Sequence, residues 1–222
     1  HQYESVVAKA PTETQKGLRT NTCTLCGKVY TEEISMVAPA RPDKASGLKM
    51  TKRTTKSLEF SWKRMPDVSY RLMLYEDGRV VSTKYVARNT TTYAKLKPAT
   101  IYTLRVTPYR IVNNQKVYAK TTVAAKTATA PEKAKLSMAK RNGRSRVRLE
   151  WKKVAGASGY EISMKTGKGN YKKIKTVGNG KTLSYTKTGL SKSKTYSFRI
   201  RAYTSVDEKK VFGDYSNVKK VK

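Results

Sequence analysis

Three residues near the start of the chain have side chains that could bind a metal ion or carry out redox chemistry. Cys23 and Cys26 are the only cysteines, and His1 is the only histidine. The pair forms a Cys-x-x-Cys motif followed by Gly27, and glycine allows the positive φ with which a chain reverses. A hairpin turn here could present two thiolates to one ion. Structural zinc needs about four ligands, so these residues, with a carboxylate such as Glu13, supply a partial set.

The same cysteine pair has two other interpretations. A thioredoxin-like redox centre needs the pair at the start of a helix within a βαβ pattern, and the sequence has neither. In an oxidising exterior we expect a disulfide between Cys23 and Cys26, or two free thiols, with zinc bound by Cys23, Cys26 and His1 as the alternative. The pair is therefore predicted to be a local clip in a small module.

No other group of residues offers catalytic chemistry. Catalysis usually requires a nucleophile with a base, paired carboxylates or a metal. Acidic residues are few and scattered, and the adjacent Glu76 and Asp77 lie in "YEDG", where Asp-Gly is a hairpin signal. The sequence therefore predicts no catalytic residue, no cofactor and no enzyme.

The chain is strongly basic, and the excess charge lies in one part of it. There are 48 Lys and Arg residues against 15 Asp and Glu residues, for a formal net charge of +33 over 222 residues. Residues 1–38 hold equal numbers of each sign, so the whole excess belongs to residues 39–222. Charge of this size attracts polyanions in a salt-dependent way and opposes self-association. We expect an anionic partner and a monomer.

Two classes of partner are not expected. No stretch approaches the ~18 consecutive apolar residues of a membrane helix, so no membrane span is predicted. The charge alone would favour nucleic acid, but the sequence contains no recognised nucleic-acid-binding module. Only non-specific, salt-sensitive binding would follow from it.

The remainder of the chain is a tandem duplication. "LEFSWKRMPDVSYRLML" (58–74) aligns with "VRLEWKKVAGASGYEISM" (147–164), and "LKPATIYTLRVTPY" (96–109) aligns with "LSKSKTYSFRIRAY" (190–203). The repeat length is about 90 residues. Each copy has a Trp followed by a Tyr, and then a Leu six positions before a second Tyr. These residues are Trp62, Tyr70, Leu96, Tyr102, Trp151, Tyr160, Leu190 and Tyr196.

Apolar residues within each copy alternate with polar ones. In "SLEFSW", for example, Leu58, Phe60 and Trp62 share one face. This period of two indicates antiparallel strands with one face in a core and the other in water. Turn signals recur at short spacing and no segment has a helical face. Several short strands in ~90 residues predict a β-sandwich.

At these residues the two copies resemble fibronectin type III domains. The resemblance places the Trp on the second strand, the first Tyr on the third, and the Leu-x5-Tyr corner at the entry to the sixth. It implies that the corner hydroxyl bonds nearby backbone and that the Trp and third-strand Tyr fill the space between the sheets. The expected fold is all-β, with two tandem immunoglobulin-like sandwiches at residues 39–130 and 131–222. A small β-hairpin module precedes them at residues 1–38.

Residues 1–38 are similar to short repeats that precede type III domains in clostridial surface proteins. "HQY", "TETQKG", "CTLCGK" and "TEEI" match those repeats in order, although some of them carry a further Cys near the position of Thr14. The Lys- and Tyr-rich composition of the chain is similar to that of type III repeats in secreted or surface proteins of Gram-positive bacteria. The resemblance implies an extracellular location, on the cell surface or in the wall, and other domains of a longer parent chain.

The expected function is a non-catalytic spacer or adhesion module that associates with anionic wall polymers such as teichoic acids. The alternative is a glycan-binding accessory region of a larger secreted carbohydrate-active enzyme, which predicts exposed aromatic residues clustered on one sheet or loop end. Seven tyrosines outside the core motifs could stack on a ligand while nearby cations meet its phosphates, or could simply cover the aliphatic stems of their neighbours. They are Tyr75, Tyr85, Tyr93, Tyr118, Tyr171, Tyr185 and Tyr215.

Overall fold

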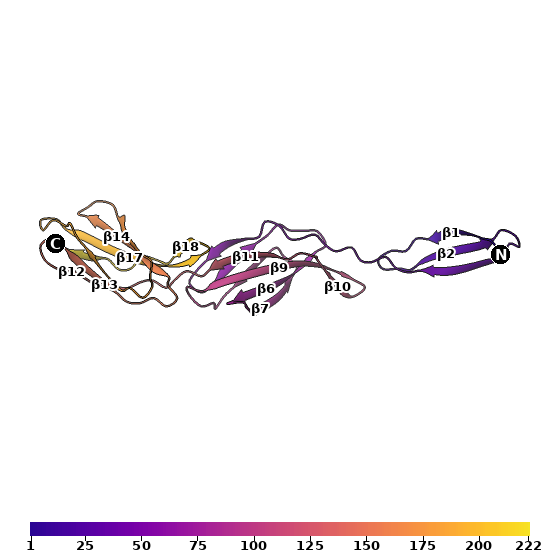
Figure 1. Ribbon diagram of the computed structural model, residues 1–222, viewed down its shortest axis with the longest axis horizontal. Coiled ribbons are helices and arrows are strands. Elements are labelled where there is room, and N and C mark those ends of the chain that lie inside the picture. The colour runs from indigo at the N-terminus through magenta and orange to yellow at the C-terminus, as the bar shows by residue number, and fades with distance from the viewer.

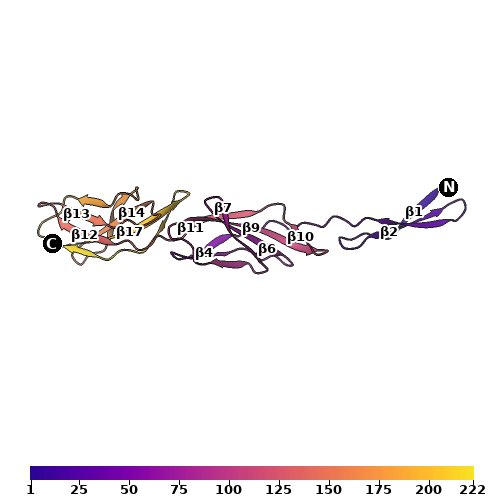
Figure 2. The same ribbon diagram turned by 90° about the horizontal axis from the view of Figure 1, so that it is seen from below.

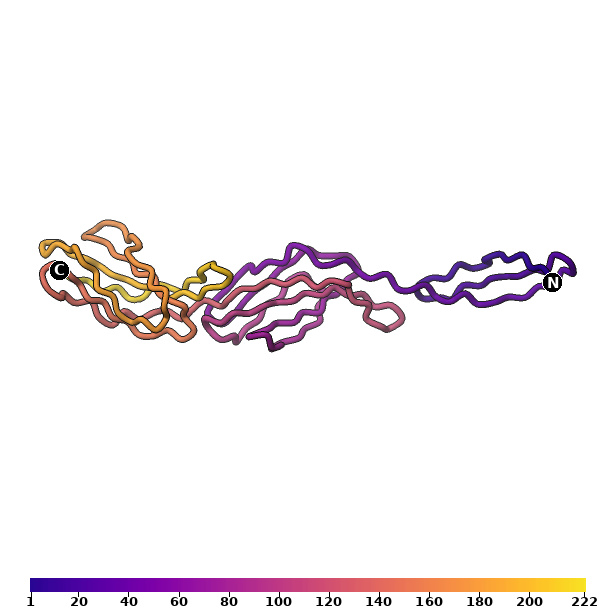
Figure 3. Tube along the Cα trace, viewed as in Figure 1, coloured from indigo at the N-terminus to yellow at the C-terminus, as the bar shows by residue number.

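The computed structural model describes residues 1–222, and its regular structure consists of β-strands alone. The strands group into three bodies that follow one another along an elongated molecule, with the two termini at opposite ends (Figures 1 and 3). A view at right angles shows the same elongated shape (Figure 2). The predicted all-β class is confirmed. No helix is present that is long and apolar enough to cross a membrane.

The N-terminal body is a three-stranded antiparallel sheet and is larger than the predicted hairpin. Strands β2 (Gly17–Cys23) and β3 (Val29–Ile34) form that hairpin, and β1 (Tyr3–Lys9) pairs with the other edge of β2. All seven residues of β1 are exposed, so its sequence shows no alternation of buried and exposed positions. None of the three buried hydrophobic clusters of the chain includes a residue of this sheet.

The first sandwich consists of two antiparallel sheets. Three strands form the smaller sheet in the order β4-β5-β8: β4 (Lys49–Arg53), β5 (Leu58–Ser61) and β8 (Thr90–Tyr93). Five strands form the larger sheet, in which β10-β9-β6-β7 are neighbours and β11 also pairs with β9. They are β6 (Ser69–Glu76), β7 (Arg79–Val86), β9 (Ile101–Val112), β10 (Gln115–Tyr118) and β11 (Val123–Ala128).

The second sandwich repeats this arrangement. Its smaller sheet has the order β12-β13-β16, formed by β12 (Leu136–Arg141), β13 (Val147–Trp151) and β16 (Ser184–Lys187). Its larger sheet has the order β15-β14-β17-β18, with β19 also paired to β17. These strands are β14 (Gly159–Thr166), β15 (Lys172–Val177), β17 (Tyr196–Val206), β18 (Lys209–Phe212) and β19 (Lys219–Val221). The duplication in the sequence is therefore a duplication of topology.

The tryptophan and third-strand tyrosine of each copy pack together between the sheets. The rings of Trp62 and Tyr70 are 5.2 Å apart, and those of Trp151 and Tyr160 are 5.4 Å apart, both edge to face. All four side chains are at most 3% exposed. Each tyrosine hydroxyl accepts a hydrogen bond from the backbone five or six residues earlier, at 2.9 Å in both copies.

The corner tyrosines adopt the geometry that the resemblance implies. The hydroxyl of Tyr102 accepts a hydrogen bond from the N–H of Lys97 at 3.1 Å, and that of Tyr196 accepts one from the N–H of Ser191 at 3.0 Å. Leu190 is buried. Leu96 is partly buried and packs against the core of the first sandwich. Each corner thus satisfies a backbone donor where the chain crosses between sheets.

The two sandwiches touch through a small apolar cluster and one ion pair. Ala128 of β11 packs with Val206 and Val211, which flank the β17–β18 hairpin. Beside them the ammonium of Lys126 lies 2.6 Å from the carboxylate of Asp207 in the turn of that hairpin. The hairpin of the second sandwich therefore docks on the last strand of the first.

Candidate polyanion-binding surface and cysteine–histidine cluster

The outer face of the larger sheet in the second sandwich carries two arginines from β17. Successive side chains of a strand point to opposite faces. Because Phe198 and Ile200 are fully buried in the core, Arg199 and Arg201 project to the other side. The alternation in "YSFRIRAY" could have identified both arginines from the sequence alone.

Aromatic rings on the same face enclose these two guanidinium groups. The guanidinium carbon of Arg199 lies 4.0 Å from the ring centre of Tyr171 and 3.7 Å from that of Tyr215. The guanidinium of Arg201 lies 4.7 Å from Tyr215 and 3.8 Å from Phe212. The result is a continuous stack in which aromatic rings and cations alternate across the sheet, termed here the arginine ladder.

Ammonium groups extend the arginine ladder at both ends. Lys165 lies 5.2 Å from the ring of Tyr171, and Lys210 lies 4.9 Å from the ring of Tyr203, which itself contacts Phe212 at 5.8 Å. One carboxylate intervenes, because Glu161 pairs with Arg201 at 2.7 Å. The ladder therefore keeps an excess of positive charge over its single acid.

The first sandwich has a corresponding cluster on its larger sheet. The ring of Tyr118 lies 4.5 Å from the guanidinium of Arg71 and 5.5 Å from the ring of Tyr109. Lys116 lies 4.1 Å from the ring of Tyr85 and 5.7 Å from that of Tyr109. Burial, and then a hydrogen bond with the hydroxyl of Tyr85, raise the pKa of Tyr118.

Next to this cluster is a shallow groove with a second pair of cation and ring. Arg105 of β9 lies 4.7 Å from the ring of Tyr75 on β6. Together with Arg71 and Thr107 these residues line a groove of about 340 Å³. Since Arg71 and Arg105 both line it, the groove is cationic, and no acidic side chain lines it.

The seven non-motif tyrosines divide into two groups. Five take part in the cation–ring contacts on the larger sheets: Tyr75, Tyr85, Tyr118, Tyr171 and Tyr215. Tyr93 is buried in the first core, where Lys84 lies 4.1 Å from its ring, and Tyr185 packs against the second core. Burial raises the pKa of Tyr93 to about 12.

The three potential metal ligands of the N-terminal sheet meet at one end of it. The Nδ1 atom of His1 lies 3.3 Å from the sulfur of Cys23 and 3.4 Å from the sulfur of Cys26. Both cysteines are free thiols, Cys23 buried and Cys26 exposed. No bond joins the two sulfurs in this structure.

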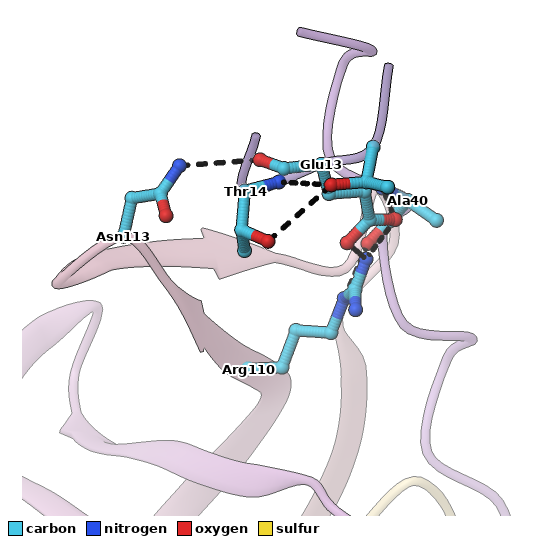
Figure 4. A network of polar contacts seen from close by, with 6 residues as sticks. Glu13, Thr14, Ala40, Arg110 and Asn113 are labelled. Carbon is cyan, nitrogen blue, oxygen red and sulfur yellow. Dashed lines mark hydrogen bonds and ion pairs between the residues drawn. The ribbon is translucent and has the colours of Figure 1, made fainter. Parts of the chain in front are cut away.

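Glu13 does not join this cluster, contrary to its inclusion among the candidate ligands. Its carboxylate binds Arg110 of β9 at 2.6 and 2.5 Å and accepts the N–H of Ala40 at 2.8 Å. Asn113 donates to the main-chain oxygen of Glu13 at 3.1 Å. Figure 4 shows how these groups converge between the N-terminal sheet and the first sandwich. No local sequence signal marks Arg110 or Asn113, because their partner lies about 100 residues away in the chain.

Comparisons with known proteins found one family match and several similar solved structures. Residues 129–212, which include strands β12 to β18 of the second sandwich, match the family model of the fibronectin type III domain. A two-domain fibronectin type III segment of chicken tenascin aligns with a TM-score of 0.49 and 17% identity, over 80% of this chain and 98% of that one. The FN1–FN3 domains of chicken CNTN1 align with a TM-score of 0.44 and 13% identity, over 92% of this chain and 77% of theirs. No curated protein matches the chain.

Proposed function

We propose that this chain is a non-catalytic, extracellular spacer that binds anionic polymers of a Gram-positive cell wall through the outer faces of its larger sheets. Fibronectin type III domains are commonly non-catalytic spacer or binding modules, which supports the first half of the proposal. We assign the units to residues 1–38, 39–130 and 131–222. The observation that carries the second half is the arginine ladder.

The positive charge of the chain is scarcely neutralised from within. Only six of the 48 Lys and Arg side chains form ion pairs with carboxylates. Many of the remaining cations are exposed, and they could replace the counterions condensed on a polyanion. Such an attraction weakens as salt rises.

The arginine ladder holds part of this positive charge in fixed positions. Rings on either side hold the guanidinium planes of Arg199 and Arg201, so little rotamer entropy is lost when an anion binds. Glu161 already occupies Nε and Nη2 of Arg201. Arg199 is in no ion pair, and its terminal N–H donors suit the two oxygens of a phosphodiester. Phosphate-rich polymers such as teichoic acids match this chemistry.

The same stack argues against a glycan-binding accessory region. A neutral sugar binds by lying on the open face of an aromatic ring. Here Arg199 occupies one face each of Tyr171 and Tyr215, and Arg201 is also within 4.7 Å of Tyr215. With these faces taken by cations, the ladder favours an anionic ligand.

Retention of the protein on purified Gram-positive cell walls, with and without teichoic acid and across a salt series, tests the proposal. We expect retention that requires teichoic acid and fades with salt. The double variant Arg105→Gln/Arg199→Gln should bind about tenfold more weakly than Lys152→Gln/Lys153→Gln. Both variants remove two charges, but Lys152 and Lys153 lie exposed in a loop after β13, away from any ring contact.

Two outcomes would contradict the proposal in different ways. Equal weakening by the two double variants would mean that diffuse charge binds and the ladder is structural. No retention at any salt would remove the wall-binding role and leave a spacer.

A further inference from the structure

We propose that His1, Cys23 and Cys26 form a binding site for a divalent transition-metal ion, with Zn²⁺ the ion of best fit. Their ligand atoms lie within 4.8 Å of one another. One imidazole nitrogen and two thiolates are a donor set that zinc prefers in proteins. This site is independent of the polyanion-binding surface, which belongs to the two sandwiches.

The separations of the ligand atoms suit a tetrahedral ion. With Zn–S bonds of about 2.3 Å and Zn–N bonds of about 2.0–2.1 Å, tetrahedral angles place sulfur and nitrogen about 3.5 Å apart. The Nδ1 atom of His1 is 3.3 and 3.4 Å from the two sulfurs. An ion would therefore enter with small side-chain adjustments.

The turn between β2 and β3 already has the form that holds a thiolate. The main-chain N–H of Gly27 donates to the carbonyl of Cys23 at 2.9 Å, and Gly27 itself has a φ of +73°. This turn brings Cys26 back beside Cys23, so that both sulfurs lie within reach of one imidazole nitrogen.

The register of β1 brings the histidine to this turn. Tyr3 pairs with Cys23 at the end of β2, and the N–H of Thr24 donates to the carbonyl of Gln2 at 2.9 Å. His1 therefore lies directly beside the cysteine turn, although more than twenty residues separate them in sequence. An ion here would join the start of β1 to the β2–β3 hairpin.

The N-terminal sheet has a physical need for such a link. No residue of this sheet belongs to a buried hydrophobic cluster, and β1 is exposed along its whole length. Units below about 40 residues usually require a disulfide, a metal or association to fold stably. Both cysteines are free thiols, so an ion held by them and His1 would supply that stability. Water would complete the coordination, since Glu13 is engaged with Arg110.

A cobalt titration of the reduced chain, residues 1–222, tests the site. Co²⁺ in a tetrahedral thiolate site produces intense visible bands and a thiolate-to-metal charge-transfer band in the near ultraviolet. We expect both at one equivalent, and their loss when Zn²⁺ is added. Hydrogen exchange of the β1–β3 amides, measured with and without Zn²⁺, should slow on binding while that of the sandwiches stays unchanged.

Variants separate ligation from folding. His1→Ala and Cys26→Ser alter exposed side chains, and each should weaken Co²⁺ binding by more than about 100-fold, since even outer-shell changes cost about 10–100-fold. Leu25→Ala is the matched control, because Leu25 lies between the cysteines, is 75% exposed and offers no ligand. It should bind Co²⁺ as the parent chain does.

Three results would overturn the proposal. One is the absence of tetrahedral Co²⁺ bands in the reduced protein. Another is a His1→Ala variant that binds as tightly as the parent, which would exclude the imidazole. The third is a disulfide between Cys23 and Cys26, formed when the protein is purified without reductant, that protects the β1–β3 amides from exchange as well as Zn²⁺ does. The sheet would then be stabilised by a covalent bond and not by a metal ion.

Discussion

Arg110 at the end of β9 donates two hydrogen bonds, of 2.6 and 2.5 Å, to the carboxylate of Glu13 in the β1–β2 loop. The two residues are 97 positions apart in the chain. The same guanidinium donates from Nε to the carbonyl of Ala40 at 2.6 Å. Arg110 thus fixes both the N-terminal sheet and the segment that leads from it into the first sandwich. Arg110 and Asn113 together hold the N-terminal sheet at this junction.

Glu13→Gln should loosen this junction without unfolding either neighbour. The neutral amide keeps the shape of the carboxylate but loses the charge that Arg110 binds at two oxygens. We expect a broader distribution of overall dimensions in small-angle X-ray scattering. Glu4→Gln, which alters an exposed residue of β1, is the control and should leave the distribution unchanged. An unaltered profile for Glu13→Gln would show that the linker alone sets the geometry.

Acid should loosen the same junction. The N–H of Ala40 and then the guanidinium of Arg110 lower the pKa of Glu13 from its ordinary value of 4.5. Because the pKa of Glu13 is lower in the intact junction than in a free carboxyl group, the contact is fully present above pH 4.5. It is lost as the pH falls through this lowered pKa. Scattering profiles should therefore broaden only below pH 4.5. The Glu13→Gln variant should be broad already and should not respond to this titration.

The two junctions of the molecule are built from equivalent hairpins. Asn113 and Asn114 turn the β9–β10 hairpin, and Asp207 and Glu208 turn the β17–β18 hairpin, all four with positive φ. The first hairpin contacts the N-terminal sheet through Asn113, and the second contacts Lys126 of the first sandwich through Asp207. Each sandwich thus uses the same hairpin to hold the unit before it, which explains the elongated shape.

Gly156 provides a further contact between the sandwiches. A Cβ atom at this position would lie 2.8 Å from both the Cβ and the carbonyl oxygen of Ala99 in the first sandwich. Gly156→Ala should therefore separate the sandwiches, in addition to a cost of about 1–2 kcal/mol for alanine at a φ of +71°. NMR relaxation of the parent chain should give one long rotational correlation time for both sandwiches. The Gly156→Ala variant should give a shorter time for each, because the two sandwiches then tumble separately.

Gly167→Ala provides the matched control for this experiment. Gly167 also has a positive φ, of +54°, but a Cβ there would meet no atom within 4 Å. It should share the backbone cost and keep the two sandwiches tumbling together. If both variants behaved alike, backbone strain and not contact with Ala99 would be responsible.

The sandwiches could be predicted because their signals are local and occur twice. Trp62 with Tyr70 and Trp151 with Tyr160 lie within ten residues of each other, and the alternation around them specifies which face is buried. The N-terminal sheet was only partly predicted, because β1 is exposed on both faces and shows no period. The ligand types at Cys23 and Cys26 were evident, but only the pairing of Tyr3 with Cys23 brings His1 to them.

The junctions lay beyond sequence reasoning for a different reason. Arg110 and Glu13 are ordinary charged residues among many, and nothing local distinguishes them from the other solvated charged residues around them. Their meeting depends on the length of β9 and the path of the linker, which no single window of sequence contains. The arginine ladder is intermediate, since the alternation around Arg199 is local while Tyr171 and Tyr215 come from other segments.

Removing either corner hydroxyl should destabilise its own sandwich. Tyr102→Phe leaves the N–H of Lys97 without its acceptor, and Tyr196→Phe does the same to the N–H of Ser191. Each loss should cost about 1 kcal/mol, the usual net value of such a bond. Urea denaturation should show a lower midpoint for the affected sandwich and an unchanged midpoint for the other. Equal midpoints in variant and parent would mean that water replaces the hydroxyl.

Alkaline pH should weaken the first sandwich through Tyr93. Its ring is 4% exposed and its hydroxyl has no hydrogen-bond partner, and burial raises its pKa from 10.0 to about 12. Between these values the unfolded chain has lost the phenolic proton while the folded chain retains it, so unfolding releases a proton and stability falls as the pH rises. The contribution is fully present below pH 10. We expect the urea midpoint of the first sandwich to drop between pH 10 and about 12.

Tyr93→Phe should reduce this alkaline loss, because phenylalanine has no proton to release. Below pH 10 the variant should be as stable as the parent or slightly more so, since the buried hydroxyl that it removes makes no hydrogen bond. Absorbance of tyrosinate at rising pH gives an independent readout, in which the variant should lack one late-titrating group. A variant that loses stability at alkaline pH as steeply as the parent would place the sensitivity elsewhere, with Tyr102 next, since burial raises its pKa as well.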